Sequence, residues 1–393
     1  MARKSGTGRY TLEIALFQML VLAVPTAAWS SDGQIELNQA QATAATGLYQ
    51  TIVIDEPGSY KLTSNLDVAS DTNGIVINAG DVTLDLNGFT VEGRGTGGLA
   101  IGIVGFTSNV RVHNGTVRNF PSDCVHLGSS ALVENLSAIS CAQDGIRLSS
   151  SGHVRGSRAL SNGLIGISMN DGGFVENSEA AGNAGVQISL GDRSSVIRCE
   201  VSAGASPGGI VVGDRSIASD NTVGVRNLPG VVGISSGDGA KISGNAIGAP
   251  AGAPNGGAGI VTGEGSVVES NTIHSFTTGL AAGIGTVVRG NSFAGRSTLD
   301  PNSFGINASG SMGLVVEDNV FSKFTVGVNI GSNSRITGNT LRASGVSGTI
   351  GLNNSGSGEP IAISGNVFDN FTINIQGAVV ETGTNLYDGS TVP

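Results

Sequence analysis

Residues 266–273 read SVVESNTI, and the same pattern returns as TVVRGNSF at 286–293, LVVEDNVF at 314–321 and SRITGNTL at 334–341. In each copy an apolar residue is followed three positions later by Asn, and two positions after that by another apolar residue. A pattern that recurs every 20 to 28 residues is typical of a solenoid, whose repeats bury their apolar side chains only against their neighbours.

Closer to the N-terminus the repeat becomes regular. Valine recurs every 21 residues, at Val112, Val133, Val154, Val175 and Val196. Extending the series backwards to Leu84 and forwards to Ile363 gives 13 anchors. Because parallel strands lie about 4.8 Å apart, these anchors predict a rod roughly 60 Å long.

A second motif, Gly followed by an apolar residue, comes after most anchors. It occurs at Gly102–Ile103, Gly145–Ile146, Gly166–Ile167, Gly185–Val186, Gly209–Ile210, Gly233–Ile234, Gly259–Ile260 and Gly327–Val328. Each repeat therefore carries at least two short strands, with apolar side chains inward and alternate side chains outward. We expect Gly to supply the turns between strands.

The recurring Asn is predicted to occupy one corner of the solenoid. Its side-chain amide can bond to the same amide one rung away. The members of this predicted ladder are Asn271, Asn291, Asn319, Asn339 and Asn366.

A leucine-rich repeat also fits this period, but it requires an apolar residue five positions before each Asn. Ser266, Thr286 and Ser334 occupy that position. The bias towards Val, Ile, Gly and Ser also favours strands on every side. The sequence therefore predicts an all-β protein, a single parallel β-helix solenoid of about 13 rungs with an N-terminal cap.

The chain resembles the right-handed parallel β-helix proteins of the pectate-lyase-like superfamily, and within it a group of exported bacterial proteins. The resemblance covers residues 48–376 and rests on PGSYKLT at 57–63, VTLDLNGF at 82–89 and the Asn ladder. It implies a right-handed helix. It implies no particular reaction, because this fold hosts lyases, hydrolases, epimerases, adhesins and scaffolds.

Four segments are expected along the chain. Residues 1–30 read as a signal peptide, because Arg3, Lys4 and Arg9 precede the apolar run from Ile14 to Val24. Residues 31–80 form the N-terminal cap and first strands, 81–376 the β-helix, and 377–393 a C-terminal tail. The signal predicts a secreted, periplasmic or cell-envelope protein, and its apolar run is shorter than the ~20 residues of a membrane span.

Composition narrows the possible partners. The chain carries 13% charged residues and a formal net charge of −10, which opposes binding to nucleic acid or an anionic membrane. Its three cysteines, Cys124, Cys141 and Cys199, allow at most one internal bridge. Whether Cys124 and Cys141 pair is left open, as is the oligomeric state.

Register converts sequence spacing into neighbours in space. Asp123 and Asp144 are 21 residues apart, as are His126 and Arg147, so each pair should lie on adjacent rungs. Residues 111–158 form a basic patch on an acidic chain; besides Arg147 and His126, it contains His113, Arg118 and Arg155.

The functional interpretation is an anionic polysaccharide lying along the helix. Elimination or epimerisation of a uronate needs a cation to neutralise its carboxylate and a base to take the adjacent proton. Arg147 could supply the cation and His126 the base, with His113, Arg118 and Arg155 binding substrate. Asp123 and Asp144 could instead form a glycosidase carboxylate pair. The structural alternative is a solvated ladder of opposite charges, worth about 0.2–1 kcal/mol per pair.

The motifs leave enzymatic activity open. SDCV at 122–125 resembles the Asp-Asp-Cys-Val of polygalacturonases with the first Asp missing, and the Asp-Pro-His of alginate epimerases is absent. No cofactor is expected, and calcium remains possible without an identified site. Two functions follow. The first is an exported protein that binds cell-envelope or extracellular polysaccharide and, if it is an enzyme, also modifies it. The second is a non-catalytic scaffold or adhesin that uses the face of the solenoid for protein contact.

Overall fold

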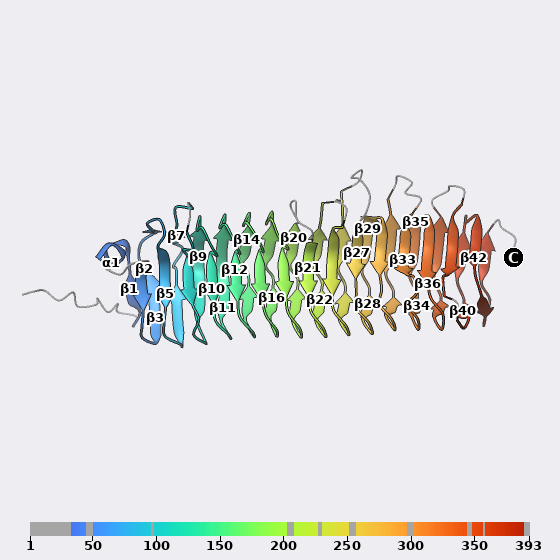
Figure 1. Ribbon diagram of the computed structural model, residues 1–393, viewed down its shortest axis with the longest axis horizontal. Helices are drawn as coiled ribbons and strands as arrows, with labels where there is room; N and C mark the ends of the chain where they lie inside the picture. The colour runs from blue at the N-terminus through green and yellow to red at the C-terminus, as the bar shows by residue number, and fades with distance from the viewer. Residues whose placement is uncertain are drawn as a thin grey trace, which may run out of the picture.

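The computed structural model describes residues 33–44, 50–95, 98–202, 208–226, 230–250, 257–296, 302–343, 348–356 and 358–388. The chain winds into a long rod of stacked parallel strands (Figure 1). The rod has about 14 turns, close to the predicted 13, and confirms the right-handed parallel β-helix. The expected signal peptide, residues 1–30, lies outside the described residues.

Sheet B has one strand per turn, and each strand pairs in parallel with those of the turns before and after it. Its strands are β2 (Gln50–Ile54), β5 (Asn73–Ile77), β8 (Ile103–Gly105), β10 (Val125–Leu127), β12 (Ile146–Leu148), β15 (Ile167–Met169), β18 (Ile188–Leu190), β21 (Gly208–Val212), β24 (Val232–Ser236), β27 (Ala258–Val261), β30 (Thr278–Ala281), β33 (Phe304–Ala308), β36 (Val326–Ile330), β39 (Ile350–Asn354) and β42 (Ile373–Gln376).

Sheet A contains two stacks of strands, which meet at a corner of the coil. The first stack is β1 (Ile35–Leu37), β3 (Gly58–Leu62), β6 (Val82–Asp85), β9 (Arg111–Arg118), β11 (Leu132–Ile139), β13 (His153–Arg155), β16 (Phe174–Glu176), β19 (Ser195–Ile197), β22 (Ile217–Ser219), β25 (Lys241–Ser243), β28 (Val267–Glu269), β31 (Val287–Arg289), β34 (Val315–Glu317), β37 (Arg335–Thr337), β40 (Ile361–Ser364) and β43 (Val379–Glu381). The second is β4 (Leu66–Asp67), β7 (Thr90–Glu92), β14 (Arg158–Leu160), β17 (Glu179–Ala181), β20 (Glu200–Ser202), β23 (Thr222–Gly224), β26 (Ala246–Gly248), β29 (Thr272–Phe276), β32 (Ser292–Gly295), β35 (Val320–Phe324), β38 (Thr340–Ala343), β41 (Val367–Asp369) and β44 (Leu386–Asp388), and β9 and β11 are long enough to contribute to both stacks.

The core is a set of apolar columns that run the length of the rod. Val112, Val133, Val154, Val175 and Val196 are paired neighbours in register, and none is exposed to solvent. The predicted 21-residue register is therefore confirmed. Each turn buries its apolar side chains against the turns above and below, as expected for a solenoid.

The Gly of the Gly-apolar motif is required by close approach between turns. A Cβ at Gly145 would lie 2.7 Å from the carbonyl oxygen of Gly166 on the next turn, and one at Gly259 would lie 2.8 Å from that of Gly279. Neither glycine has a positive φ. The motif glycines are therefore required because the neighbouring backbone leaves no room for a side chain. Other glycines, such as Gly156 and Gly244, have a positive φ and do supply turns between strands, as predicted.

The predicted Asn ladder is confirmed at the corner between the two stacks of sheet A. The Nδ2 of Asn291 donates to the Oδ1 of Asn319 at 2.9 Å, and Asn319 donates to Asn339 at 3.0 Å. The same oxygens also accept the backbone N–H of the preceding turn's Asn. The ladder continues beyond the predicted members, and its side chains are Asn221, Asn245, Asn271, Asn291, Asn319, Asn339, Asn366 and Asn385.

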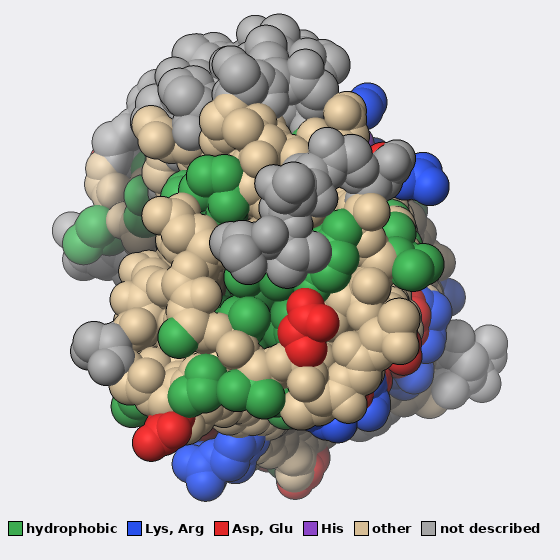
Figure 2. Space-filling model, turned by 90° about the vertical axis from the view of Figure 1, so that its right-hand side faces the viewer, with side chains coloured by type: hydrophobic (Ala, Val, Ile, Leu, Met, Phe, Trp, Pro, Cys, Tyr) green, Lys and Arg blue, Asp and Glu red, His purple; other side chains and the backbone are tan. Residues whose placement is uncertain are grey.

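The two ends of the rod differ. The short helix α1 (Gln39–Ala44) lies at the N-terminal end beside β2 and β4 (Figure 1). Figure 2 looks onto the opposite end, where apolar side chains gather inside a rim of polar ones. Ile373, Val380 and Leu386, on the last strands of the three stacks, are 44–62% exposed.

Candidate functional site

One outward column of sheet B carries the strongest of the predicted candidates. Strand pairing places His126 between Val104 on the preceding turn and Arg147 on the following turn. The full column, one residue per strand, is Val53, Val76, Val104, His126, Arg147, Ser168, Ser189, Val211, Ser235, Val261, Ala281, Asn307, Asn329, Asn353 and Gln376. Within this column only His126 and Arg147 have ionisable side chains.

The column corrects one predicted position. Gln187 was expected to face outward after the Gly185–Val186 motif, but the strand begins at Ile188 and Ser189 takes the outward position. Gln187 is fully buried, and its Oε1 accepts hydrogen bonds from the backbone N–H and the Nδ2 of Asn183. These bonds hold Gln187 in the corner, and the strand starts at Ile188, two residues later than the motif predicts.

Asp123 orients the imidazole of His126. The residue lies at the corner before β10, where its Oδ2 is 3.1 Å from the Nδ1 of His126. Its other oxygen, Oδ1, accepts the backbone N–H of Asp144 at 2.9 Å. The side chain of His126 is 20% exposed and that of Asp123 is 3% exposed. His126 is thus a solvent-accessible imidazole held by a buried carboxylate.

Asp144 repeats this arrangement one turn later. Its Oδ1 accepts the backbone N–H of Ile165 at 3.0 Å, and its Oδ2 accepts the hydroxyl of Ser168 at 2.8 Å. Burial raises the pKa of this carboxyl, the two hydrogen bonds oppose the rise, and the nearby Asp123 adds to it. The spacing correctly places the two acids on adjacent turns. However, both accept backbone N–H groups and both are almost fully covered, which does not favour a glycosidase pair.

Arg147 lies on the rim of a shallow depression of about 350 Å³. The depression is lined by Asp144, Ser168 and Ser189, together with Leu164 and Asn170. Arg147 is exposed and makes no salt bridge among the described residues, although its charge lowers the pKa of the neighbouring Asp144 against the effect of burial. Its guanidinium is therefore available to an anion from solution.

The other predicted binding residues lie on sheet A, where each is paired with an acid. His113 is 3.7 Å from Asp85, and Arg118 is 2.7 Å from Glu92. Arg155 and Arg111 both contact the buried Glu134. Burial alone would raise the pKa of Glu134, but hydrogen bonds from the two arginines hold it below its ordinary value. The structure therefore does not bring His113, Arg118 and Arg155 together with His126 and Arg147.

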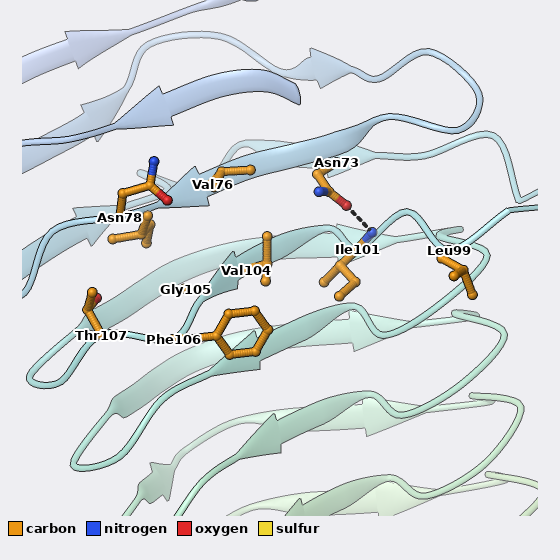
Figure 3. Close-up of a pocket in the computed structure, with 10 residues that line it drawn as sticks. Asn73, Val76, Asn78, Leu99, Ile101, Val104, Gly105, Phe106 and Thr107 are labelled. Carbon is orange, nitrogen blue, oxygen red and sulfur yellow. Dashed lines mark hydrogen bonds between the residues drawn. The ribbon is translucent and has the colours of Figure 1, made fainter. Parts of the chain in front are cut away.

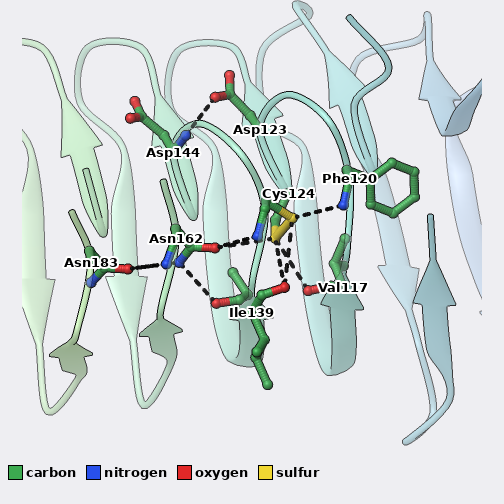
Figure 4. The surroundings of a disulfide bond; sticks show 10 residues. Val117, Phe120, Asp123, Cys124, Ile139, Asp144, Asn162 and Asn183 are labelled. Atoms are coloured by element: carbon green, nitrogen blue, oxygen red, sulfur yellow. Dashed lines mark hydrogen bonds between the residues drawn. A yellow bond between two sulfur atoms is a disulfide. The ribbon is translucent and has the colours of Figure 1, made fainter. Parts of the chain in front are cut away.

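A disulfide lies behind the acid pair, as Figure 4 shows. Cys124, next to Asp123 in the chain, is bonded to Cys141, which answers the question of pairing. The backbone N–H of Cys141 donates to the Oδ1 of Asn162, which begins a second, shorter amide ladder with Asn183. Cys199 is free and buried, and burial raises its pKa to about 11. The corner that carries Asp123 is thus covalently fixed to the next turn.

Sequence reasoning missed two exposed apolar residues beside His126. Phe106 is 70% exposed, and its ring meets that of His126 edge-on with centroids 5.0 Å apart. With Leu99, which is 80% exposed, it flanks a hollow of about 360 Å³ over Val76 and Val104 (Figure 3). The available signal was an aromatic residue directly after a predicted strand, in a chain with few aromatic residues.

A family model described as the right-handed beta helix region matches residues 51–202, which include every residue of this site. The match covers less than half of the chain, and it agrees with the right-handed parallel β-helix that the described residues form. No curated protein matches this β-helix.

Several solved structures are similar to this chain at low sequence identity. The Dettilon tailspike protein is 12% identical, with a TM-score of 0.37, over 90% of this chain and 63% of its own; the chain thus spans less than two thirds of that protein. The periplasmic alginate epimerase AlgG is 13% identical, with a TM-score of 0.38, over 87% of this chain and 84% of its own. The A-module of the mannuronan C-5 epimerase AlgE6 of Azotobacter vinelandii is 10% identical, with a TM-score of 0.40, over 90% and 94%.

Two kinds of feature are absent from the described part of the chain. No group of three or more His, Cys, Asp or Glu side chains is arranged to hold a metal ion there. No helix in that part is long and apolar enough to cross a membrane.

Proposed function

We propose that this protein binds an extended anionic polysaccharide along the outward face of sheet B, with His126 and Arg147 as the contacts for its carboxylate. The observation that carries the proposal is their position side by side in a column that is otherwise uncharged. An anion on this face meets positive charge there. Successive strands about 4.8 Å apart present repeated contacts, which suit a polymer lying along the rod.

The state of Arg147 supports this proposal. The arginines of the basic patch on sheet A are each engaged by an acid, as Arg158 is by Glu179 at 2.7 Å. Arg147 is exposed and has no such partner among the described residues. A guanidinium binds carboxylate with paired hydrogen bonds, which are stronger than neutral ones.

Export to the periplasm, the cell envelope or the medium forms part of the proposal. The basic and apolar pattern of residues 1–30 supports it. The Cys124–Cys141 bond supports it independently, because disulfides persist mainly in oxidising compartments. A cell-envelope or extracellular polysaccharide would be within reach there.

The test is the affinity for a soluble polyuronate, measured by titration calorimetry. Arg147→Ala should weaken binding about tenfold or more, the scale of one lost charge-assisted hydrogen bond. Arg158→Ala is the matched control, because it removes an exposed arginine from sheet A. Wild-type affinity should fall with salt, since exposed charges are screened within about 10 Å at 0.1 M. Equal affinities for all three proteins would refute the proposal and favour the scaffold or adhesin.

Catalysis is the second candidate, and the pairing of His126 with Asp123 favours it. A His whose Nδ1 is held by a carboxylate presents its Nε2 as a proton acceptor. Elimination of a uronate would release unsaturated ends, whereas hydrolysis would release reducing ends. His126→Gln should abolish either product while leaving Arg147-dependent binding measurable. A polymer that is bound and released unchanged by the wild type would leave only the binding function.

A further inference from the structure

The hollow between Leu99 and Phe106 lies on the same face as His126 and has a different chemical character. Its floor is Val76 and Val104, which are 8% and 6% exposed, and its two walls are exposed apolar side chains. None of its lining residues carries a charge. A part of a ligand that sits here would be neutral and would have an apolar side.

The polar groups at the hollow define that part further. At one end, Asn73 Oδ1 accepts the backbone N–H of Ile101 at 2.8 Å, so its Nδ2 remains as a donor. At the other end, Asn78 Nδ2 donates to Asp55 at 2.8 Å, so its Oδ1 remains as an acceptor. Figure 3 shows the two amides at opposite ends of the apolar floor. An acetamido group fits the Asn73 end, because its carbonyl accepts a hydrogen bond and its methyl packs on Leu99 and Ile101. A sugar hydroxyl can donate to Asn78.

The hollow lies next to the proposed carboxylate site. The rings of Phe106 and His126 pack in a T-shaped arrangement, and Val104 is two strands from Arg147 in the same column. Two strand spacings make roughly 10 Å, about the length of a disaccharide. One chain of sugars can therefore occupy both places at once.

We infer that the hollow binds an N-acetylhexosamine unit of the same polymer whose uronate unit contacts Arg147. The substrate class is thus a polysaccharide that combines uronate with N-acetylated amino sugar. This inference rests on the proposed function and narrows it. The face of Phe106 that is open to solvent stacks on the apolar side of the sugar ring, and such aromatic contacts give selectivity at little conformational cost.

The experiment compares two soluble probes that carry the same number of carboxylates. One is an oligosaccharide of alternating glucuronate and N-acetylglucosamine, and the other is an oligo-uronate. Titration calorimetry would be performed on the wild type and on Phe106→Ala, Leu99→Ala and Arg147→Ala. Met312→Ala is the control for loss of an exposed apolar side chain elsewhere, since Met312 is 48% exposed. Leu99→Ala separates the hollow from any effect of Phe106 on His126.

The wild type should bind the alternating probe about tenfold more tightly than the oligo-uronate, a difference of about 1.4 kcal/mol. Phe106→Ala and Leu99→Ala should each reduce this preference and leave the affinity for oligo-uronate within about twofold, whereas Arg147→Ala should weaken both probes. Equal wild-type affinities, or a proportional loss for both probes in Phe106→Ala, would overturn the inference and leave the proposed function standing. A preference that survives Arg147→Ala at full affinity would overturn the proposed function. Self-association that Phe106→Ala abolishes would assign the hollow to a second copy of the chain.

Discussion

The Nδ1 of His126 lies 3.1 Å from the Oδ2 of Asp123, a carboxylate almost fully covered by the surrounding chain. A carboxylate in this position accepts a hydrogen bond from Nδ1–H. The unprotonated Nε2 is then the acceptor that faces solvent. The same carboxylate also accepts the backbone N–H of Asp144. The orientation of the exposed imidazole is therefore tied to the register between two turns.

Asp123→Asn should reverse the tautomer of His126. The amide oxygen can keep the bond to the backbone of Asp144, while the Nδ2 donates to the Nδ1 of His126 and moves the ring proton to Nε2. Nitrogen chemical shifts of the neutral imidazole would report the change. Asp85→Asn, beside His113 on sheet A, is the control and should leave His126 unaffected. An unchanged His126 tautomer in Asp123→Asn would show that the carboxylate does not set it.

Asp144→Asn should stabilise the protein at pH 7. Burial raises the pKa of this carboxyl above its ordinary value, so the charged form is disfavoured in the folded state. The stability linked to a raised pKa is fully present below the unfolded value of about 3.9 and is lost as pH rises through the folded one. In the variant the amide oxygen still accepts the backbone N–H of Ile165, the Nδ2 donates to the Ser168 hydroxyl in place of accepting from it, and the loss is avoided. Its advantage, at most about 1 kcal/mol, should shrink as pH falls to about 4. Urea denaturation across pH would measure it, and an advantage independent of pH would contradict the argument.

Asn319→Leu should break the amide ladder at its centre. Without Asn319, the backbone N–H of Asn291 loses its acceptor, and the Nδ2 of Asn291 keeps only its bonds to the backbone carbonyls of Val268 and Arg289. Unsatisfied buried donors of this kind cost about 1–3 kcal/mol. The free energy of unfolding in urea should fall by that amount, whereas Val320→Thr, at the exposed neighbouring position, should change it little. Equal stabilities of the two variants would show that the ladder contributes nothing.

Reduction of the Cys124–Cys141 bond should destabilise the fold. The bond joins residues 17 positions apart, and closing a loop of that length stabilises by about 3 kcal/mol. Denaturation with and without dithiothreitol would measure the loss. The double variant Cys124→Ala, Cys141→Ala should be insensitive to the reductant. If wild type and double variant respond alike, the bond is absent in solution.

Val154→Ala should leave a cavity in the central apolar column. Val154 is fully buried between Val133 and Val175, and removal of such a side chain costs about 1–3 kcal/mol. Val53→Ala, on the outward face and 39% exposed, is the matched control. Thermal or urea denaturation would distinguish them, and a Val154 variant as stable as the Val53 variant would contradict the register.

The columns could be predicted because a solenoid turns sequence spacing directly into contact. Val154 and Asn319 recur at fixed intervals, and each meets its counterpart on the next turn. Prediction was wrong at Gln187 because a hydrogen bond to Asn183, rather than the Gly185 motif, determines where the next strand starts. Spacing carries no information about such corner contacts.

The site was predictable in part for the same reason. The adjacency of His126 and Arg147 followed from their 21-residue spacing. Arg155 is engaged by Glu134 on sheet A, whereas Arg147 makes no salt bridge among the described residues. This difference depends on the directions of side chains on two different sheets, which spacing does not give. Phe106 follows its strand and lies outside the inward and outward alternation, so no periodic pattern identifies it.

Every strand of sheet B pairs only with strands of the turns before and after it. Turns that are far apart along the rod therefore do not depend on one another for strand pairing. The candidate site occupies the turns from β5 to β18, and the turns from β24 onward share no strand pairing with it. A whole turn could be lost or duplicated there, changing the length of the rod by one strand spacing, about 4.8 Å, without moving His126 relative to Phe106. Ligand recognition can therefore change by substitution near the N-terminal end, and the length of the rod can change separately by the number of turns that follow.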